Sequence, residues 1–377
     1  MDKTWRVGVI GAGFMGKTHT LALHAVGAVF GLDTRPVADM IATSSVESAE
    51  RAAARLGFAR YTGDWRELVS DSAIDAVIVA APLPHREMVL AALEHGKHVL
   101  CEKPLASHTA EAIEMRDAAE QTGLACMVGL NYPKNPASQL ARDLIADGTL
   151  GEIVSARIVH VEDFLADPGL PVDWRMRAAE AGKAGALGDL GSHAIGMAHW
   201  LLGPIAEVMA ETRVIHRERP DDNTGQRVPV ENDDQADLLL RFVRGVSASL
   251  HVSRVATGHK MGLSYEIVGT KGTIIFDQER LSELQLYAHT DDARVTGFRR
   301  IPIGPSHRDY GDFCPAPGHG TGYNDMVTIQ MRDFIAASTG HCPKAWPNFS
   351  DALAVHRVID AALDSARAGH WVNVAED

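Results

Sequence analysis

A group of three glycines near the start of the chain constrains its fold most. Gly11, Gly13 and Gly16 have the spacing G-x-G-x-x-G; residues 6–10 before them are predicted as a strand, and residues 13–25 as a helix. Glycines are required where a strand turns sharply into a helix and where phosphates approach the backbone at a helix N-terminus. The alternative is a tight turn without a ligand. The context favours a dinucleotide site, to which we assign Gly11, Gly13, Phe14, Met15 and Gly16.

Short β-rich runs alternate with alanine-rich runs over the first third of the chain, a pattern typical of a parallel sheet covered by helices. The predicted strands are residues 6–10, 37–42, 76–80, 98–100 and 125–129. The predicted helices are residues 13–25, 46–56, 65–70, 86–95 and 107–122. We therefore expect an α/β fold that begins with a Rossmann domain over residues 1–130.

The alternation of predicted strands and helices ends after residue 130, and β-rich segments dominate from there on. A chain of 377 residues with 46% hydrophobic content exceeds what one ordinary core accommodates, which favours a second domain over residues 131–377. Its predicted strands, typical of a mostly antiparallel sheet, are residues 153–161, 205–216, 235–242, 246–253, 264–268 and 272–277. Helices are predicted over residues 137–147 and 351–368, and one long loop over residues 217–234.

Charge and composition exclude several classes of protein. The net charge of -13 argues against a nucleic-acid partner, because phosphate binding needs a basic surface. The four cysteines lack C-x-x-C spacing, so we expect reduced thiols and no metal site. The apolar runs are too short to span a membrane, and the first strand leaves no room for a signal peptide. We expect a cytoplasmic protein.

The residue that receives the adenosine ribose depends on where the second strand lies. Asp33 stands near the usual distance of about 20 residues and would favour NAD. Residues 37–42 form a better strand, however, and then Thr43 and Ser44 lie at its end. Hydroxyl groups would also tolerate the extra phosphate of NADP. The second register is preferred, and the cofactor stays NAD or NADP.

Two further segments carry groups suited to proton transfer. Lys103 follows a short predicted strand, where ligands bind in open α/β sheets, and could stabilise an alkoxide. Asp189 and His193 would lie on one face of a helix, and a histidine can accept a hydroxyl proton beside a carboxylate. The alternatives are a solvated lysine, a capping aspartate and a packed histidine.

The motifs GAGFMG, EKPL and GALGDLGSH together resemble the Gfo/Idh/MocA family, which includes glucose-fructose oxidoreductase and inositol dehydrogenases. The resemblance covers essentially the whole chain and implies that Lys103, Asp189 and His193 are the catalytic residues. It also implies an open sheet in the second domain, through which such chains form homodimers or homotetramers. A closer similarity to a levoglucosan-dehydrogenase-like branch is seen in DWR at residues 173–175 and PAPGHGTGY at residues 315–323.

The resemblance also suggests further site residues. For the cofactor these are Thr43, Ser44, Ala80, Pro82, His85, Glu102, Lys103 and Asn131. For the substrate they are Lys103, Tyr132, Glu162, Trp174, Arg175, Asp189 and His193. Tyr132 and Glu162 could equally be a packed ring and a surface charge. The chain departs from the family at Thr43, where an acidic residue is usual, and at Ala80-Ala81-Pro82, where T-P-N is usual.

These observations predict an NAD(P)-dependent dehydrogenase that acts on a ring carbinol of a sugar, anhydrosugar or inositol. His193 would remove the hydroxyl proton, Lys103 would stabilise the oxygen, and Asp189 would fix the geometry. Two alternatives remain: an NAD-dependent glycosidase that uses transient oxidation, and a sensor of sugars or nucleotides without catalysis.

Overall fold

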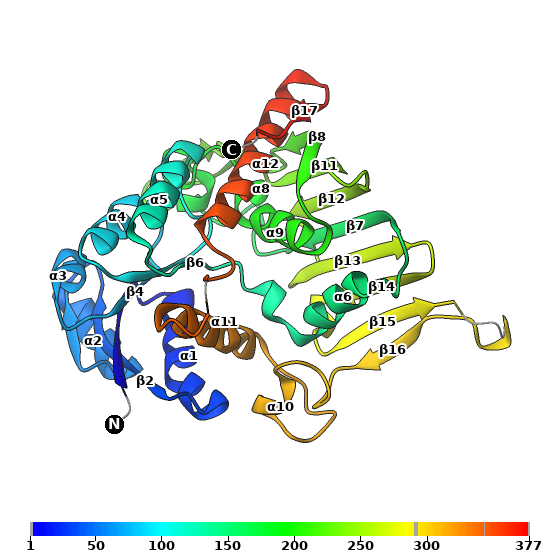
Figure 1. Ribbon diagram of the computed structural model, residues 1–377. Coiled ribbons are helices and arrows are strands. Elements are labelled where there is room, and N and C mark those ends of the chain that lie inside the picture. The colour runs from blue at the N-terminus through cyan, green and yellow to red at the C-terminus, as the bar shows by residue number, and fades with distance from the viewer. Residues whose placement is uncertain (1–2, 290–292, 343, 376–377) are drawn as a thin grey trace. The chain divides into compact units, whose positions relative to one another are not determined.

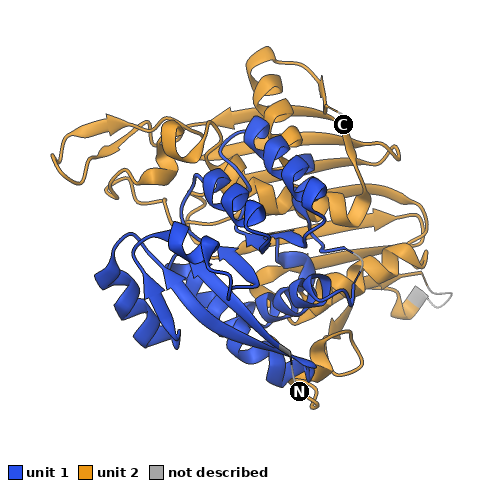
Figure 2. Cartoon of the chain, turned by 60° about the vertical axis from the view of Figure 1, so that its left-hand side comes forward, with its two compact units in different colours: residues 1–134, 322–354 blue, residues 135–321, 355–377 orange. Residues whose placement is uncertain are grey.

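The computed structural model describes residues 3–289, 293–342 and 344–375. The chain forms two compact units, coloured separately in Figure 2. Unit 1 comprises residues 1–134 and 322–354, and unit 2 comprises residues 135–321 and 355–377. The domain boundary after residue 130 stays a prediction. The two compact units divide the chain differently, because residues 322–354 group with the N-terminal residues that contain the glycine turn.

Unit 1 is built on a six-stranded sheet with the order β3-β2-β1-β4-β5-β6, in which all neighbouring strands are parallel (Figure 1). Its strands are β1 (Lys3–Ile10), β2 (Thr34–Ala42), β3 (Arg60–Thr62), β4 (Ala76–Val79), β5 (His98–Cys101) and β6 (Cys126–Val128). Parallel neighbours need crossover connections, and helices supply them. These helices are α1 (Phe14–Phe30), α2 (Val46–Leu56), α3 (Trp65–Ser70), α4 (Arg86–Glu94) and α5 (Thr109–Thr122). A 3-10 helix, η1 (Tyr132–Lys134), and α11 (Tyr323–Ser338) complete the unit.

The two faces of this sheet are covered because the side chains of β1 alternate between them. Trp5, Val7 and Val9 are buried in a core shared with α1 and α11, where Trp5 meets Phe334 at 5.6 Å between ring centroids. Gly8 faces the other layer, and a Cβ atom there would lie 2.5 Å from the side chain of Leu68 in α3. This two-sided burial is typical of a doubly wound Rossmann sheet.

The strand order also positions the site. Because β1 lies between β2 and β4, the chain winds first to one side of β1 and later to the other. Ligands of open α/β sheets bind at such a reversal, outside the carboxyl ends of the strands. Gly11 directly follows β1, and Ala80 directly follows β4.

Unit 2 contains a nine-stranded open sheet with the order β16-β15-β14-β13-β7-β12-β11-β8-β17. Its strands are β7 (Ile153–Val161), β8 (Ile205–Arg213), β11 (Gln235–Phe242), β12 (Ser247–Ser253), β13 (Gly262–Gly269), β14 (Gly272–Asp277), β15 (Glu283–Ala288), β16 (Arg299–Pro302) and β17 (Val372–Asn373). Within this nine-stranded sheet, among the described residues, only β7 and β12 pair in parallel. All of its other neighbouring strands are antiparallel. The predicted fold class is thus confirmed.

Helices cover one face of this sheet, since β7 and β12 pack against α9, β11 and β12 against α8, and β14 and β15 against α6 (Figure 1). The helices of unit 2 are α6 (Pro136–Ala146), α7 (Ala178–Ala181), α8 (Ala186–Asp189), α9 (Gly191–Leu202) and α10 (Tyr310–Phe313). The 3-10 helices are η2 (Trp174–Met176), η3 (Gln278–Arg280) and η4 (Ala293–Val295). Helix α12 (Phe349–Ala368) begins in unit 1 and continues into unit 2. No helix of the described chain is long and apolar enough to cross a membrane.

Two predictions of local structure are wrong. The segment predicted as one long loop, residues 217–234, contains the hairpin β9 (Glu218–Pro220) and β10 (Arg227–Pro229), because the buried Arg219 anchors it. Asp189 and His193 do not share one continuous helix, because α8 ends at Asp189 and α9 begins at Gly191. The sequence analysis also missed α11, whose apolar residues match the core of unit 1.

Candidate active site

The glycine turn of unit 1 has the geometry that a phosphate site needs. Gly11 has a φ of +102°, and a Cβ atom there would lie 2.5 Å from the carbonyl oxygen of Ala80. A Cβ at Gly16 would lie 2.1 Å from the carbonyl oxygen of Gly11. At Gly13, by contrast, no atom of the described residues other than Gly13 and its two chain neighbours lies within 4 Å of that position. Two glycines therefore serve the packing of the turn, and Gly13 leaves room for a ligand.

The N-terminus of α1 is suited to an anion. Its first turn, residues 14–17, carries no acidic side chain, and Gly13 at its start is exposed. Helix N-termini attract phosphate through free N–H groups and the helix dipole. The turn therefore fits the pyrophosphate of a dinucleotide.

The position of β2 decides between the two ribose registers. Because β2 runs from Thr34 to Ala42, Asp33 lies at its amino end, which excludes the register with Asp33. Thr43 and Ser44 follow the carboxyl end, and the N–H of Gly11 donates to the carbonyl of Ala42 at 2.9 Å. The Thr43 hydroxyl donates to the carbonyl of Ser45 at 3.0 Å. The tip of β2 thus lies directly beside the glycine turn.

A carboxylate, Glu47, occurs nevertheless in the first turn of the following helix. Hydrogen bonds from its own backbone N–H and from the Ser45 side chain lower the pKa of Glu47. This exposed side chain therefore stays ionised close to Ser44 and Ser45. Sequence analysis missed it because the acidic residue stands in α2 instead of directly at the end of the strand.

Asn131, at the carboxyl edge of the unit 1 sheet, also indicates that a ligand binds there, in addition to the glycine turn. It lies beyond β6 with 1% of its surface exposed, and neither its Nδ2 nor its Oδ1 has a hydrogen-bond partner among the described residues. A buried amide without partners is unfavourable, since each polar group loses its bonds to water. A bound cofactor with polar groups would satisfy it.

Glu102 is held firmly at the end of β5. Its Oε1 lies 2.7 Å from Nε2 of His19, a residue of α1 that sequence analysis did not single out, and both side chains are buried. Its Oε2 accepts a hydrogen bond from the backbone N–H of Lys103 at 3.2 Å. A Cβ at Gly129 would lie 2.6 Å from Oε1, so only glycine fits there. Glu102 thereby fixes the backbone that carries Lys103.

His85 lies beneath the loop that follows β4. Its Nε2 lies 2.9 Å from the carbonyl oxygen of Ala81, and burial lowers the pKa of the ring, which is neutral at pH 7. Ala80 and Pro82 belong to the loop that His85 holds, and the N–H of Ala80 donates to Ile10 at 2.8 Å. The buried His85 ring therefore holds the loop in place through the carbonyl of Ala81.

An aromatic group lines the glycine turn. Phe14 is 71% exposed and stacks on Tyr323 at 5.8 Å between centroids. Tyr323 also lies 6.2 Å from the ring of Tyr132, and its hydroxyl donates to Sδ of Met15 at 3.4 Å. Tyr323 was missed because it belongs to α11, far away in the sequence.

The groups expected in the second domain lie together in unit 2. Oδ2 of Asp189 is 3.6 Å from Nε of Arg175, and that guanidinium lies over the Trp174 ring at 4.5 Å. Asp173 caps η2, since it accepts the N–H of Arg175 at 2.8 Å. A carboxylate, a cation and an aromatic face thus adjoin one another.

His193 joins this group through a second histidine. The ring of His193 lies 5.8 Å from the ring of His160, on β7. Nδ1 of His160 lies 2.9 Å from the carbonyl oxygen of Leu190, at the break between α8 and α9. Its Nε2 lies 3.3 Å from Oε1 of Glu162. The predicted residues Glu162 and His193 therefore both adjoin His160, which the sequence analysis missed.

The predicted site residues thus form two sets, one in each unit. The set in unit 1 suits a dinucleotide, and the set in unit 2 offers a proton acceptor beside an ion pair. Among the described residues, no group of three or more His, Cys, Asp or Glu side chains could hold a metal ion.

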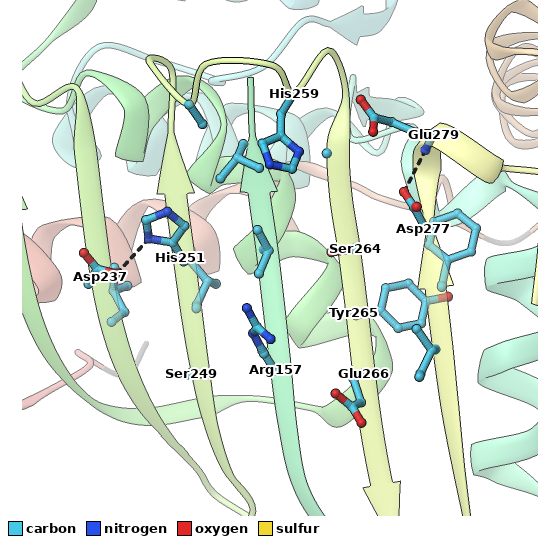
Figure 3. Close-up of a pocket in the computed structure, with 18 of the residues that line it drawn as sticks. Arg157, Asp237, Ser249, His251, His259, Ser264, Tyr265, Glu266, Asp277 and Glu279 are labelled. Carbon is cyan, nitrogen blue, oxygen red and sulfur yellow. Dashed lines mark hydrogen bonds and ion pairs between the residues drawn. The ribbon is translucent and has the colours of Figure 1, made fainter. Parts of the chain in front are cut away.

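A further hollow of unit 2 lies away from these residues. It measures about 1030 Å³ and lies on the sheet face opposite the helices, with none of the predicted site residues in its lining (Figure 3). His251 of β12 faces Asp237 of β11 with 2.7 Å between Nδ1 and Oδ1, and Arg157 lies opposite Glu266 on β7 and β13.

Comparison with known proteins assigns the class. Residues 5–130 match the oxidoreductase family with an NAD-binding Rossmann fold, and residues 138–275 match the GFO/IDH/MocA C-terminal domain. The chain belongs to the Gfo/Idh/MocA family of oxidoreductases. This confirms the predictions of an oxidoreductase and of a nicotinamide dinucleotide as its cofactor.

Particular relatives narrow the class. The chain is 38% identical to levoglucosan dehydrogenase of Pseudarthrobacter phenanthrenivorans over 98% of both chains. It is 27% identical to inositol 2-dehydrogenase of Rhizobium meliloti over 99% of this chain and 100% of that one. A solved structure of levoglucosan dehydrogenase with NADH and L-sorbose superposes with a TM-score of 0.96 and 38% identity over 100% of both chains. These relatives have the activities that the sequence analysis expected.

Proposed function

We propose that this protein is an NAD(P)-dependent dehydrogenase that oxidises a ring carbinol of a sugar, with an anhydrosugar such as levoglucosan as the first candidate. The observation that carries the proposal is the group in unit 2, where Asp189 adjoins Arg175 and His193 adjoins His160. A related levoglucosan dehydrogenase with NADH and levoglucosan superposes with a TM-score of 0.95 at 38% identity.

The residues that hold the cofactor are assigned first. Its pyrophosphate would lie at the glycine turn, its adenosine ribose at Thr43 and Ser44, and its nicotinamide end near Asn131, Glu102 and the loop at residues 80–82. When bound, the nicotinamide supplies the hydride acceptor. Because the ionised Glu47 would repel a 2′-phosphate, we propose NAD as the preferred cofactor.

The catalytic roles fall to three residues. His193 accepts the proton of the substrate hydroxyl, Lys103 stabilises the oxygen as it loses that proton, and Asp189 orients the reacting group. Tyr132, Glu162, Trp174 and Arg175 bind the other hydroxyls and the ring face of the sugar. A histidine suits the first role because its ordinary pKa lies near neutrality.

The test is absorbance of reduced nicotinamide with NAD and NADP, measured separately over levoglucosan, glucose, L-sorbose, myo-inositol and a set of glycosides. Reduction with one of the sugars supports the proposal. Cleavage of a glycoside without net reduction makes the protein a redox-assisted glycosidase. Tight cofactor binding with neither reaction makes it a sensor.

We also propose that the chain forms a homodimer or homotetramer through the open face of its unit 2 sheet, in the cytoplasm. The support is an apolar surface with paired charges: Leu239 is 53% exposed, and Arg157 and Glu266 lie opposite each other. All four cysteines are free thiols, as expected for a reducing compartment. Leu239→Lys should lower the mass measured by light scattering, while Tyr61→Lys, an exposed site in unit 1, should leave it unchanged.

A further inference from the structure

An acidic run lies between the β9–β10 hairpin and β11. It contacts the segment that carries Arg175 and the helix that carries Asp189, the two partners of the ion pair described above. Residues 231–234 read Glu-Asn-Asp-Asp, and the last three are buried. Sequence analysis placed this run in a long loop with no role. Its contacts lead to residues 175–178 on one side and to α8 on the other.

Asn232 holds the backbone of Arg175. Its Nδ2 donates to the carbonyl oxygen of Arg175 at 2.8 Å. Its Oδ1 accepts a hydrogen bond from the Arg254 guanidinium at 3.0 Å, and that guanidinium also donates to the Arg175 carbonyl at 3.4 Å. The carbonyl of Arg175 is therefore fixed by two donors.

Asp233 holds the start of α8 in the same way. Its two carboxylate oxygens accept the backbone N–H groups of Gly185 at 2.7 Å and of Leu187 at 2.8 Å. Its own carbonyl accepts the N–H of Ala186 at 2.8 Å, and a Cβ at Gly185 would lie 2.1 Å from that oxygen. Since α8 has only four residues and ends at Asp189, holding its first turn also places that carboxylate.

The run is anchored by a buried ion pair. Nε of Arg254 lies 2.9 Å from Oδ1 of Asp234, and both side chains are at most 1% exposed. Oδ2 of Asp234 accepts the N–H groups of Ile215 and His216 at 2.8 and 2.9 Å. Because the other hydrogen-bonding atoms of this buried ion pair also have partners, the pair anchors the run in one position.

The Arg175–Asp189 pair does not fix its own geometry. Its atoms are 3.6 Å apart, and the two side chains are 39% and 27% exposed. Ion pairs exposed to this degree contribute little to stability. The backbones that carry the two groups therefore contribute to their separation, and adjacent residues of one run hold both backbones.

We propose that Asn232 and Asp233 are positioning residues, which hold Arg175 and Asp189 at the spacing that the reaction requires. This inference rests on the proposed dehydrogenase function. Neither residue needs to touch the substrate, because each acts through the backbone of a residue that does.

The first experiment compares Asn232→Ala with Asn135→Ala in the full chain. Asn135 is a matched control, because it is equally buried, accepts one backbone N–H at 2.8 Å and donates to one carbonyl at 3.1 Å, but contacts neither segment. We expect kcat/KM for the sugar to fall about tenfold in Asn232→Ala, mainly through kcat, and to change less than twofold in the control. A change below twofold in Asn232→Ala overturns the proposal.

A second variant, Asn232→Asp, keeps an acceptor for Arg254 and replaces the donor to the Arg175 carbonyl by a carboxylate oxygen, which cannot donate when ionised. It should act in the same direction if Asn232→Ala does not fold. In an Arg175→Met background, either substitution should have less than half of its effect on kcat/KM, because the backbone contact of residue 175 remains but the guanidinium that it positions is gone. If the fold-change in kcat/KM of the double variant equals the product of the two single fold-changes, the Asn232 substitution acts independently of Arg175. That result would indicate a general structural role and would overturn the proposal.

Hydrogen exchange separates this inference from the proposed function. In Asn232→Ala, the amides of residues 174–178 and 185–189 should exchange faster than in the wild type, whereas Asn135→Ala should leave both segments unchanged. Unchanged exchange overturns the positioning role. Faster exchange in a protein whose wild type oxidises no sugar overturns the dehydrogenase proposal, while the role of Asn232 in holding these segments stands.

Discussion

Nε2 of His19 lies 2.7 Å from Oε1 of Glu102, and this buried contact joins α1 to the end of β5. Removing the His19 ring leaves Oε1 of the buried Glu102 without this hydrogen bond, a change that typically costs about 1–3 kcal/mol. We expect His19→Leu to lower the free energy of unfolding, measured with urea, by about that amount. His19→Gln can still donate to Glu102 and should lose less than half as much. Equal losses in the two variants would show that the ring packing, and not the hydrogen bond, matters.

Lys103 and His193 should separate chemistry from cofactor binding. Lys103→Ala and His193→Ala should each lower turnover at least about 100-fold, the scale of a lost acid-base or charge-stabilising group. The dissociation constant of the reduced cofactor, measured by fluorescence, should change little. Lys271→Ala, in the turn between β13 and β14, is the control. Unchanged turnover in Lys103→Ala would remove that residue from the mechanism.

Cofactor preference should depend on Glu47. Hydrogen bonds from the backbone and from Ser45 lower the pKa of Glu47, so its charge faces the end of β2 at neutral pH. Glu47→Gln removes this charge and keeps the shape of the side chain. The ratio of kcat/KM for NADP to that for NAD should rise about fivefold, because the repulsion between Glu47 and the 2′-phosphate is relieved. Glu50→Gln, one turn further along α2, should leave the ratio within twofold.

Gly13 should be needed by the cofactor and not by the fold. No described atom other than those of Gly13 and its two chain neighbours lies within 4 Å of a Cβ built at Gly13. Gly13→Ala should therefore keep the unfolding temperature of the free protein within about 2 °C. Because the pyrophosphate would use that space, the dissociation constant of NAD, measured by calorimetry, should rise at least about tenfold. Gly27→Ala, in the last turn of α1, should not change cofactor binding.

The parts of the fold that follow from local pattern were predictable. The glycine turn and the alternating strands and helices of unit 1 follow from spacing and composition, which act over a few residues. Asp189 and His193 were found as a pair, but the start of the short helix that ends at Asp189 is held by the carboxylate of Asp233, more than 40 residues away. Residues that act through such distant contacts leave no local pattern in a single sequence. The same reason explains why Tyr323 and His160 were missed.

The stability of unit 2 should fall in mild acid because of His199. Burial lowers the pKa of His199 from 6.5 to about 4, and its Nε2 has no hydrogen-bond partner among the described residues. The folded state thus favours the neutral ring, while the unfolded chain takes up a proton below pH 6.5. The stabilisation is complete above that pH and is lost as the pH falls towards 4, by up to about 3 kcal/mol.

His199→Leu needs no proton and no partner, so its free energy of unfolding should fall less steeply between pH 6.5 and 4 than that of the wild type. Urea unfolding at intervals of half a pH unit measures both slopes. His95→Leu, at an exposed position after α4, should keep the slope of the wild type. Parallel curves for His199→Leu and the wild type would mean that the acid sensitivity arises from another group, because a histidine buried as a neutral ring must contribute to the slope in this range.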